Sequence, residues 1–223
     1  MKKLISILSI VLAFTACNNY KDVDRTNYQI TKNINDWGEF NSGSFWIFQN
    51  DSTNEIMDTI GIAQDFKTET SPAVTLMEID PRIDKSKDLF EFQQTILSSK
   101  TSGKNDMIFY GNTEVYGNDV IQWSERYYDL DINAFAGIFR INDKGVIEEE
   151  FDLYLNHYSI KSIDKLEILG KNYSDIAHVT FKRVDTDNIY QYWISKNNWI
   201  IKKVFIVEDK TYSWSLKESI IKQ

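Results

Sequence analysis

Proline is almost absent from this chain, and this scarcity constrains the fold more than any other feature. The 223 residues include only two prolines, Pro72 and Pro81, which lie in a stretch that we interpret as a loop or a strand edge. Proline cannot donate a backbone hydrogen bond, so within sheets it is confined to edges and bulges. The long segments on either side are therefore free to donate every backbone N–H group to a sheet.

Apolar residues recur along these segments with the two-residue period of half-buried strands. The segments Leu89–Leu97, Phe151–Leu155 and Tyr212–Leu216 place most of their apolar side chains on one face. A sustained helical period is missing from the sequence, and the short segments Asn33–Phe40 and Ser162–Leu166 are the best helix candidates. The pattern predicts an all-β fold, either an antiparallel sandwich or an open barrel whose curvature protects its edges.

Polar turns separate the predicted strands in the second half of the chain. Asn142–Gly145 joins Phe135–Ile141 to Val146–Phe151, and its glycine suits the positive φ of a bulged hairpin turn. Three further turns, rich in aspartate, asparagine and lysine, predict a four-stranded antiparallel meander at the C-terminal end. Its strands are Asp175–Arg183, Ile189–Ser195, Trp199–Val207 and Thr211–Lys217.

The N-terminus carries an export signal. Lys2 and Lys3 precede an apolar run, Leu4–Ala16, which is shorter than the roughly 20 residues that span a bilayer. Cys17, the only cysteine, follows directly. This arrangement resembles a bacterial lipoprotein signal, although Phe14 stands where that pattern usually has leucine. The resemblance implies removal of residues 1–16 and attachment of palmitate-type lipid to Cys17, with two or three acyl chains giving durable membrane anchoring. The alternative is an ordinary signal peptide that is cut near Ala16.

The remainder of the chain is predicted to be a polar tether, residues 17–35, followed by a single antiparallel β domain, residues 36–223. Five short segments stand out at the two ends of this domain: Gly43–Phe48, Asp58–Ile60, Tyr190–Ile194, Trp199–Lys203 and Tyr212–Leu216. These segments resemble those of envelope lipoproteins of Bacteroidota-type bacteria. The resemblance implies an outer-membrane location, on the periplasmic face or the cell surface, and this architecture, but no activity.

The net charge argues against nucleic acid as a partner. Removal of residues 1–16 leaves 23 basic and 33 acidic residues, so the charge changes from −8 to −10. Phosphate binding depends on clustered lysine and arginine, which an acidic surface of this kind does not favour.

The sequence predicts no cofactor and no metal site. Asp129–Asn133 has the alternating oxygen spacing of a calcium loop, but Ala134 and Arg140 stand where an EF-hand needs glycine and glutamate. An EF-hand is thereby rejected, and a looser calcium site or a solvated turn remains. The two histidines, His157 and His178, do not form a close ligand pair, and we expect His178 on the polar face of its strand.

Catalytic motifs are also missing from the sequence, which favours a non-catalytic function over an enzymatic one. The glycine-flanked serine of a nucleophile elbow is absent. The densest acidic cluster is Glu148–Glu150 with Asp152, and a solvated strand edge explains it more simply than glycoside hydrolysis.

One aromatic stretch, Trp123–Tyr128, is the candidate ligand-binding site, with Trp123, Tyr127 and Tyr128 as contact residues and core packing as the alternative. The leading hypothesis is a lipid-anchored, non-catalytic binding or accessory module. Its partner would be a glycan, a lipid or other apolar small molecule, or another envelope protein. The alternatives are a glycan hydrolase with carboxylates from separate strands, and a purely structural lipoprotein.

Overall fold

A computed structural model describes residues 27–28, 36–37, 40–72, 89–99, 105–113, 118–127, 132–153 and 156–222. Several residues of the sequence predictions lie outside these ranges, among them Cys17, Pro81, Tyr128, Leu155 and the first three residues of Asp129–Asn133. No helix within the described part of the chain has the length and hydropathy needed to cross a membrane.

The described residues form fourteen strands, which confirms the predicted all-β class. The first seven are β1 (Asn27–Tyr28), β2 (Phe45–Asn50), β3 (Ile56–Pro72), β4 (Leu89–Ser99), β5 (Asn105–Thr113), β6 (Asn118–Tyr127) and β7 (Ile132–Asn142). The others are β8 (Gly145–Val146), β9 (Glu149–Leu153), β10 (Asn156–Ile168), β11 (Lys171–Arg183), β12 (Ile189–Ser195), β13 (Trp199–Val207) and β14 (Lys210–Ile220). The short β1 pairs in parallel with β4 although its residues belong to the predicted tether.

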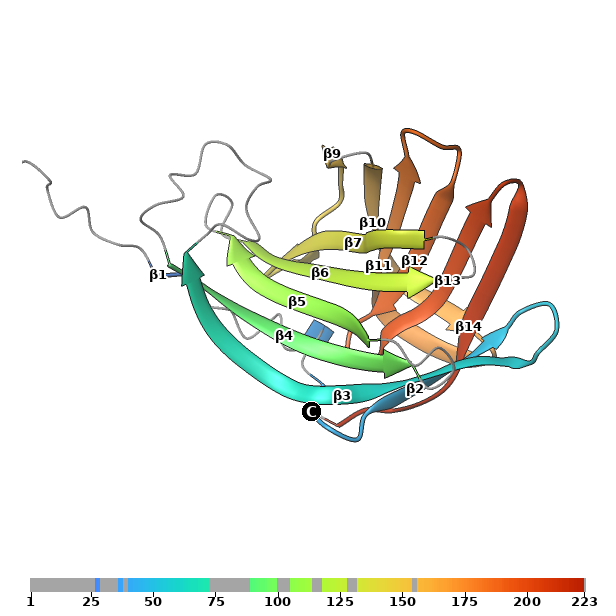
Figure 1. Ribbon diagram of the computed structural model, residues 1–223, viewed down its shortest axis with the longest axis horizontal. Helices are drawn as coiled ribbons and strands as arrows, with labels where there is room; N and C mark the ends of the chain where they lie inside the picture. The colour runs from blue at the N-terminus through green and yellow to red at the C-terminus, as the bar shows by residue number, and fades with distance from the viewer. Residues whose placement is uncertain are drawn as a thin grey trace, which may run out of the picture.

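The strands belong to one sheet with the order β8-β7-β6-β5-β4-β3-β2-β14-β13-β12-β11-β10-β9. Neighbours along this order are antiparallel, and most of them are also neighbours in sequence. The exception is the pair of β2 with β14, which joins the two halves of the chain. Figure 1 shows the sheet curving back on itself, and β7 and β8 approach β11. Among the described residues no pairing joins β8 to β9, so the sheet is folded but not closed.

Hydrogen bonds fasten the C-terminal end to the start of β2. The Lys222 N–H donates to Ser44 Oγ at 2.8 Å, and the Asn41 N–H donates to the Lys222 carbonyl at 2.8 Å. Ser44 is 1% exposed, so these contacts are shielded from water. They extend the β2–β14 pairing beyond the strand ends and support the junction of the two halves.

The predicted C-terminal meander is present. β11, β12, β13 and β14 pair sequentially, and the bounds of β12 and β13 match the predicted segments. Trp214 and Leu216 are buried as the two-residue period requires, and Tyr212 on the same face is half-buried. The turn glycine Gly145 has φ of +116°, in agreement with the predicted hairpin.

Two sequence predictions are wrong in detail. Ser162–Leu166 lies in β10 instead of a helix, because register pairing with Ile176, Ala177 and their neighbours in β11 holds the backbone extended. The predicted strand Val146–Phe151 is divided: β8 pairs with β7, whereas β9 pairs with β10 at the opposite end of the sheet. Of the predicted helix Asn33–Phe40, residues 36 and 37 are helical.

Candidate functional site

Aromatic rings fill the interior of the folded sheet near the β12–β13 turn. They come from β2, β6, β7, β12 and β13 and from a segment that precedes β2, and each is 3% exposed or less. Edge-to-face contacts join them, the arrangement that ring quadrupoles favour. We call this set the aromatic cluster: Trp37, Phe40, Trp46, Trp123, Phe139, Tyr192 and Trp199.

Trp123 lies at the centre of the cluster. Its ring centroid is 5.2 Å from that of Tyr192, 5.7 Å from that of Trp199 and 6.2 Å from that of Phe139. Directly opposite in register is Gly137, at which a Cβ atom would overlap the indole ring. The position of Trp123 therefore depends on a glycine in the neighbouring strand.

The indole nitrogen of Trp123 has no hydrogen-bond acceptor. Among the described residues, Trp123 Nε1 is the buried side-chain polar atom without a partner. The indole of Trp46, also buried, donates to the Asn198 carbonyl at 2.8 Å. A buried donor without an acceptor costs about 1–3 kcal/mol, and native proteins rarely retain one without a reason. Trp123 thus presents an available donor inside an apolar environment.

A lysine also lies inside the sheet. Lys203 in β13 is 2% exposed, and its Nζ atom lies 4.5 Å from the ring centroid of Phe48. It pairs in register with Tyr192 on β12, the residue whose ring contacts Trp123.

A short segment outside the strands covers this end of the interior. We call Asp36, Trp37 and Phe40 the plug. The Trp37 ring contacts Phe139 at 5.4 Å, and the Phe40 ring contacts Trp46 at 5.0 Å. In Figure 1 residues 36 and 37 form the short blue piece within the curve of the sheet.

Two polar contacts hold the plug to the β12–β13 turn. Asp36 forms an ion pair with Lys196 at 3.0 Å, and its carbonyl accepts a hydrogen bond from the Asn197 N–H at 2.6 Å. In the same turn the buried Trp199 has φ of +64°, a conformation that is unfavourable for a bulky residue. The surrounding contacts must stabilise this backbone, and they direct the Trp199 ring into the cluster.

A different aromatic group lies on the other face of the C-terminal strands. Trp193 stacks on His178 with centroids 4.3 Å apart, and Lys202 Nζ lies 5.8 Å from its ring centroid. Burial lowers the pKa of His178, and the positive charge of Lys161 lowers it further. Lys161, His178, Trp193 and Lys202 are register partners on neighbouring strands, and this cross-strand ladder stabilises the sheet. Within β11, the His178 side chain points to the face opposite that of the buried Ala177, Val179 and Phe181, as the sequence predicts.

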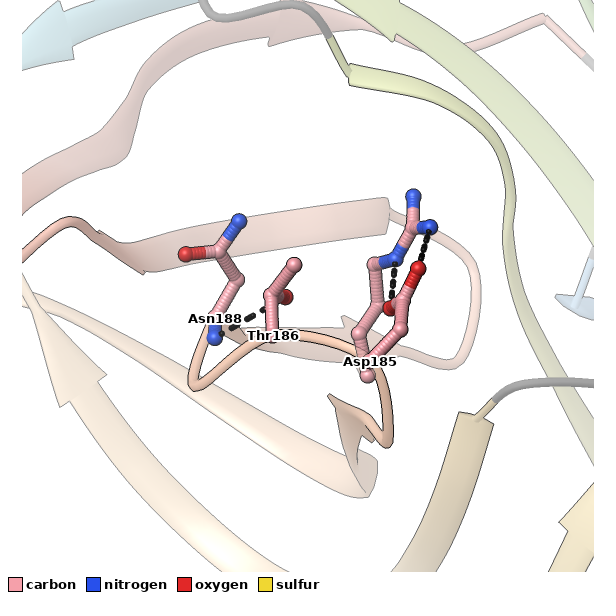
Figure 2. Close-up of polar contacts among 4 residues, drawn as sticks. Asp185, Thr186 and Asn188 are labelled. Atoms are coloured by element: carbon pink, nitrogen blue, oxygen red, sulfur yellow. Dashed lines mark hydrogen bonds and ion pairs between the residues drawn. The ribbon is translucent and has the colours of Figure 1, made fainter.

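The β11–β12 turn shows how the polar residues at the strand ends are used (Figure 2). Two hydrogen bonds from Arg183 reach the Asp185 carboxylate at 2.9 Å and 2.6 Å and hold the pKa of that carboxyl below its usual value. The Asn188 N–H donates to Thr186 Oγ1 at 3.3 Å. These contacts belong to an exposed turn, as the sequence predicts, and they define its local geometry.

The acidic cluster has structural contacts of its own. Glu149 accepts hydrogen bonds from Arg140 of β7, and Glu148 accepts one from the Ser162 N–H at 2.9 Å. Asp152 lies 2.7 Å from His157. Glu148 and Glu150 are exposed on or beside the edge strand β9, where acids discourage edge-to-edge association.

The predicted site residues are only partly located by the structure. Trp123 is 1% exposed and packs in the core, which agrees with the packing alternative, while Tyr127 ends β6. Their contact with a ligand stays a prediction.

Within the described ranges, no three histidine, cysteine, aspartate or glutamate side chains lie close enough to hold a metal ion. Sequence reasoning missed the contributions of Gly137, Lys203 and the plug, although Trp37 and Phe40 have a helical spacing.

Comparisons with known proteins give little further information. No family model matches the chain, and no curated protein matches it significantly. The chain is similar to a solved crystal structure of a "putative lipoprotein" from Parabacteroides distasonis, with 11% sequence identity and a TM-score of 0.37. This similarity covers 83% of the present chain and 98% of the other.

Proposed function

We propose that this protein is an envelope lipoprotein, anchored to the outer membrane through Cys17, whose β domain is a non-catalytic binding module. The observation that carries the binding role is the Trp123 N–H group, which is buried among aromatic rings without an acceptor. An apolar site with a few well-placed polar groups is typical of small-molecule binding. This composition favours an apolar small molecule or a lipid over the glycan and protein partners.

The alternative of glycan hydrolysis receives less support. It requires two carboxylates that face each other across a substrate, with separations of about 5–10 Å. Glu149 and Asp152 are engaged with Arg140 and His157, and Glu150 accepts a hydrogen bond from Ser159 at 3.4 Å. These contacts provide the acidic cluster with a structural role.

The binding role is tested by recovering bound material. The native protein is purified from its membrane, and mass spectrometry of the extracted material identifies any ligand that is present in reproducible, near-stoichiometric amount. A lipid or other apolar molecule is the expected result, and a glycan would keep the binding role but change the ligand class. Recovery of no ligand in repeated purifications would contradict it.

The anchor is tested independently of the ligand. The change Cys17→Ser removes the lipid acceptor, so the variant should move from the membrane fraction to the soluble fraction. Ser215→Ala, a substitution within the sheet, is the control and should stay in the membrane fraction. A Cys17→Ser protein that remains membrane-bound after a salt wash would contradict the anchor.

A further inference from the structure

The plug is separated by a single aromatic ring from Trp123, whose indole N–H has no acceptor. Trp37 contacts Phe139, and Phe40 contacts Trp199 at 6.2 Å between ring centroids. Phe139 and Trp199 are two of the rings that contact Trp123. Withdrawal of the plug would therefore uncover two of the rings that pack directly against Trp123.

The attachment of the plug is suited to reversible displacement. Its one ion pair in the described residues, Asp36 with Lys196, has side chains that are 44% and 36% exposed. Exposed pairs of this kind contribute about 0.2–1 kcal/mol. The other attachments are a backbone hydrogen bond and the apolar contacts of two rings, and an entering apolar ligand would replace those apolar contacts with its own.

We propose that the interior covered by the plug is a binding site for an acyl chain that ends in a carboxylate or an ester carbonyl. The Trp123 N–H donates to the acyl oxygen, the aromatic cluster contacts the chain, and the plug is displaced as the ligand enters. This inference rests on the proposed binding role and names the ligand class of the same site.

The chemistry of the site selects this class. The indole N–H is a donor only, so its partner must carry an acceptor. The rings around Trp123 favour an apolar body.

The test uses the full chain carrying Cys17→Ser, so that detergent does not compete for the site. Titration calorimetry measures binding of laurate and of dodecylammonium, which has a chain of the same length but offers no acceptor. Lauroyl-lysophosphatidylcholine distinguishes an acyl lipid from a free fatty acid. We expect saturable binding of laurate or of the lysolipid, and weaker or undetectable binding of dodecylammonium. If neither acyl compound binds, or if dodecylammonium binds equally well, the proposal is overturned.

Trp123→Phe keeps an aromatic ring but removes the donor. Laurate affinity should fall about tenfold or more, as expected for a hydrogen bond to a charged group. Trp193→Phe is the matched control, because Trp193 lies on the other face of the C-terminal strands and outside the aromatic cluster, and it should leave the affinity within about twofold. Unchanged affinity in a folded Trp123→Phe protein would overturn the role of the donor.

A measurement on the unsubstituted cluster covers the case in which Trp123→Phe does not fold. In a ¹⁵N-labelled protein, the indole N–H resonance of Trp123 should shift downfield when laurate binds. Binding that leaves this resonance unchanged would also overturn the proposal.

The plug is tested through its ion pair. Asp36→Asn should raise the apparent laurate affinity by up to about fivefold, because a weaker closed state increases the binding-competent fraction. Asp187→Asn, which breaks the exposed ion pair with Lys182, is the control and should have no effect. Equal affinities for the two variants would overturn the displacement of the plug. A different ligand recovered from the native protein would overturn the acyl ligand but leave the binding role intact.

Discussion

Gly137 of β7 lies directly opposite Trp123 of β6 and provides the space that the indole ring occupies. A Cβ atom at Gly137 would overlap carbons Cζ2 and Cη2 of that ring. Glycine within a strand often marks a close approach of this kind. The most central ring of the aromatic cluster is thus positioned by a residue that has no side chain.

Gly137→Ala should destabilise the protein by about 1–3 kcal/mol, because the added methyl group forces Trp123 out of its packed position. Urea unfolding measures this change in the free energy of unfolding. Gly61→Ala is the control: Gly61 also lies in a strand, and the nearest atom to its built Cβ is the Ser44 carbonyl oxygen at 3.9 Å. The control should be neutral or slightly stabilising. Equal effects of the two substitutions would contradict this account.

Local sequence patterns predicted those parts of the fold that depend on neighbouring residues. Polar turns define both ends of Ile189–Ser195 and Trp199–Val207, so the bounds of β12 and β13 were predicted correctly. The pairing of β2 with β14 was not predicted, because it joins segments that are far apart in sequence, as the Ser44–Lys222 contact at a separation of 178 residues illustrates. The division of Val146–Phe151 also depends on long-range partners.

The candidate site was predictable only in its residue types. Trp123 is a candidate from the sequence because it belongs to an aromatic stretch, but alternation does not reveal which face of β6 lies inside the folded sheet. The missing acceptor of its N–H group depends on atoms from several strands. The ion pair of Asp36 with Lys196 likewise joins two distant segments, so neither residue signals the plug in the sequence.

The indoles of Trp46 and Trp123 should respond differently to substitution by phenylalanine. Both are almost completely buried, so the loss of ring packing is similar. Trp46→Phe also leaves the Asn198 carbonyl without its 2.8 Å donor, whereas Trp123→Phe removes a donor that has no partner. In ligand-free protein, Trp46→Phe should therefore lower the free energy of unfolding by about 1–3 kcal/mol more than Trp123→Phe. Equal losses in urea unfolding would indicate that Trp123 has an acceptor in solution.

His178 should make the protein less stable in mild acid. Its pKa in the folded state is below the ordinary histidine value of 6.5, so the unfolded state binds a proton first as the pH falls. The contribution of His178 is fully present above pH 6.5 and is lost progressively as the pH decreases toward the folded-state pKa. Urea unfolding from about pH 7 to 5 should show this decline, and His178→Gln should reduce it.

The charge of Lys161 provides a second test of the same group. Lys161 pairs with His178 across β10 and β11, and removal of its charge should raise the pKa of His178 toward its ordinary value. Burial is the larger cause and remains, so Lys161→Gln should produce only part of the shift. An NMR titration of the His178 ring in the wild type and in Lys161→Gln measures it. An unchanged pKa would mean that solvent screens this pair.

The ion pair between Arg140 and Glu149 should stabilise the region in which the chain passes from one end of the sheet to the other. Arg140 lies in β7 and Glu149 in β9, with side chains that are 27% and 12% exposed. Arg140 Nε donates to Glu149 at 2.8 Å, and a second nitrogen of the guanidinium contacts the other carboxylate oxygen. In the sequence between these two residues lies Ile147, whose N–H donates to the Arg140 carbonyl at 2.9 Å.

Glu149→Gln should cost about 1–3 kcal/mol, because it weakens two charge-assisted hydrogen bonds from a partly buried guanidinium. Glu150→Gln is the matched control, since Glu150 is exposed and should change stability by less than about 0.5 kcal/mol. A double-mutant cycle of Arg140→Met with Glu149→Gln isolates the pair, and hydrogen exchange shows whether the loss is confined to β7–β9. Additive effects in that cycle would mean that the two residues contribute independently, and the edge strand β9 would then depend on its pairing with β10 alone.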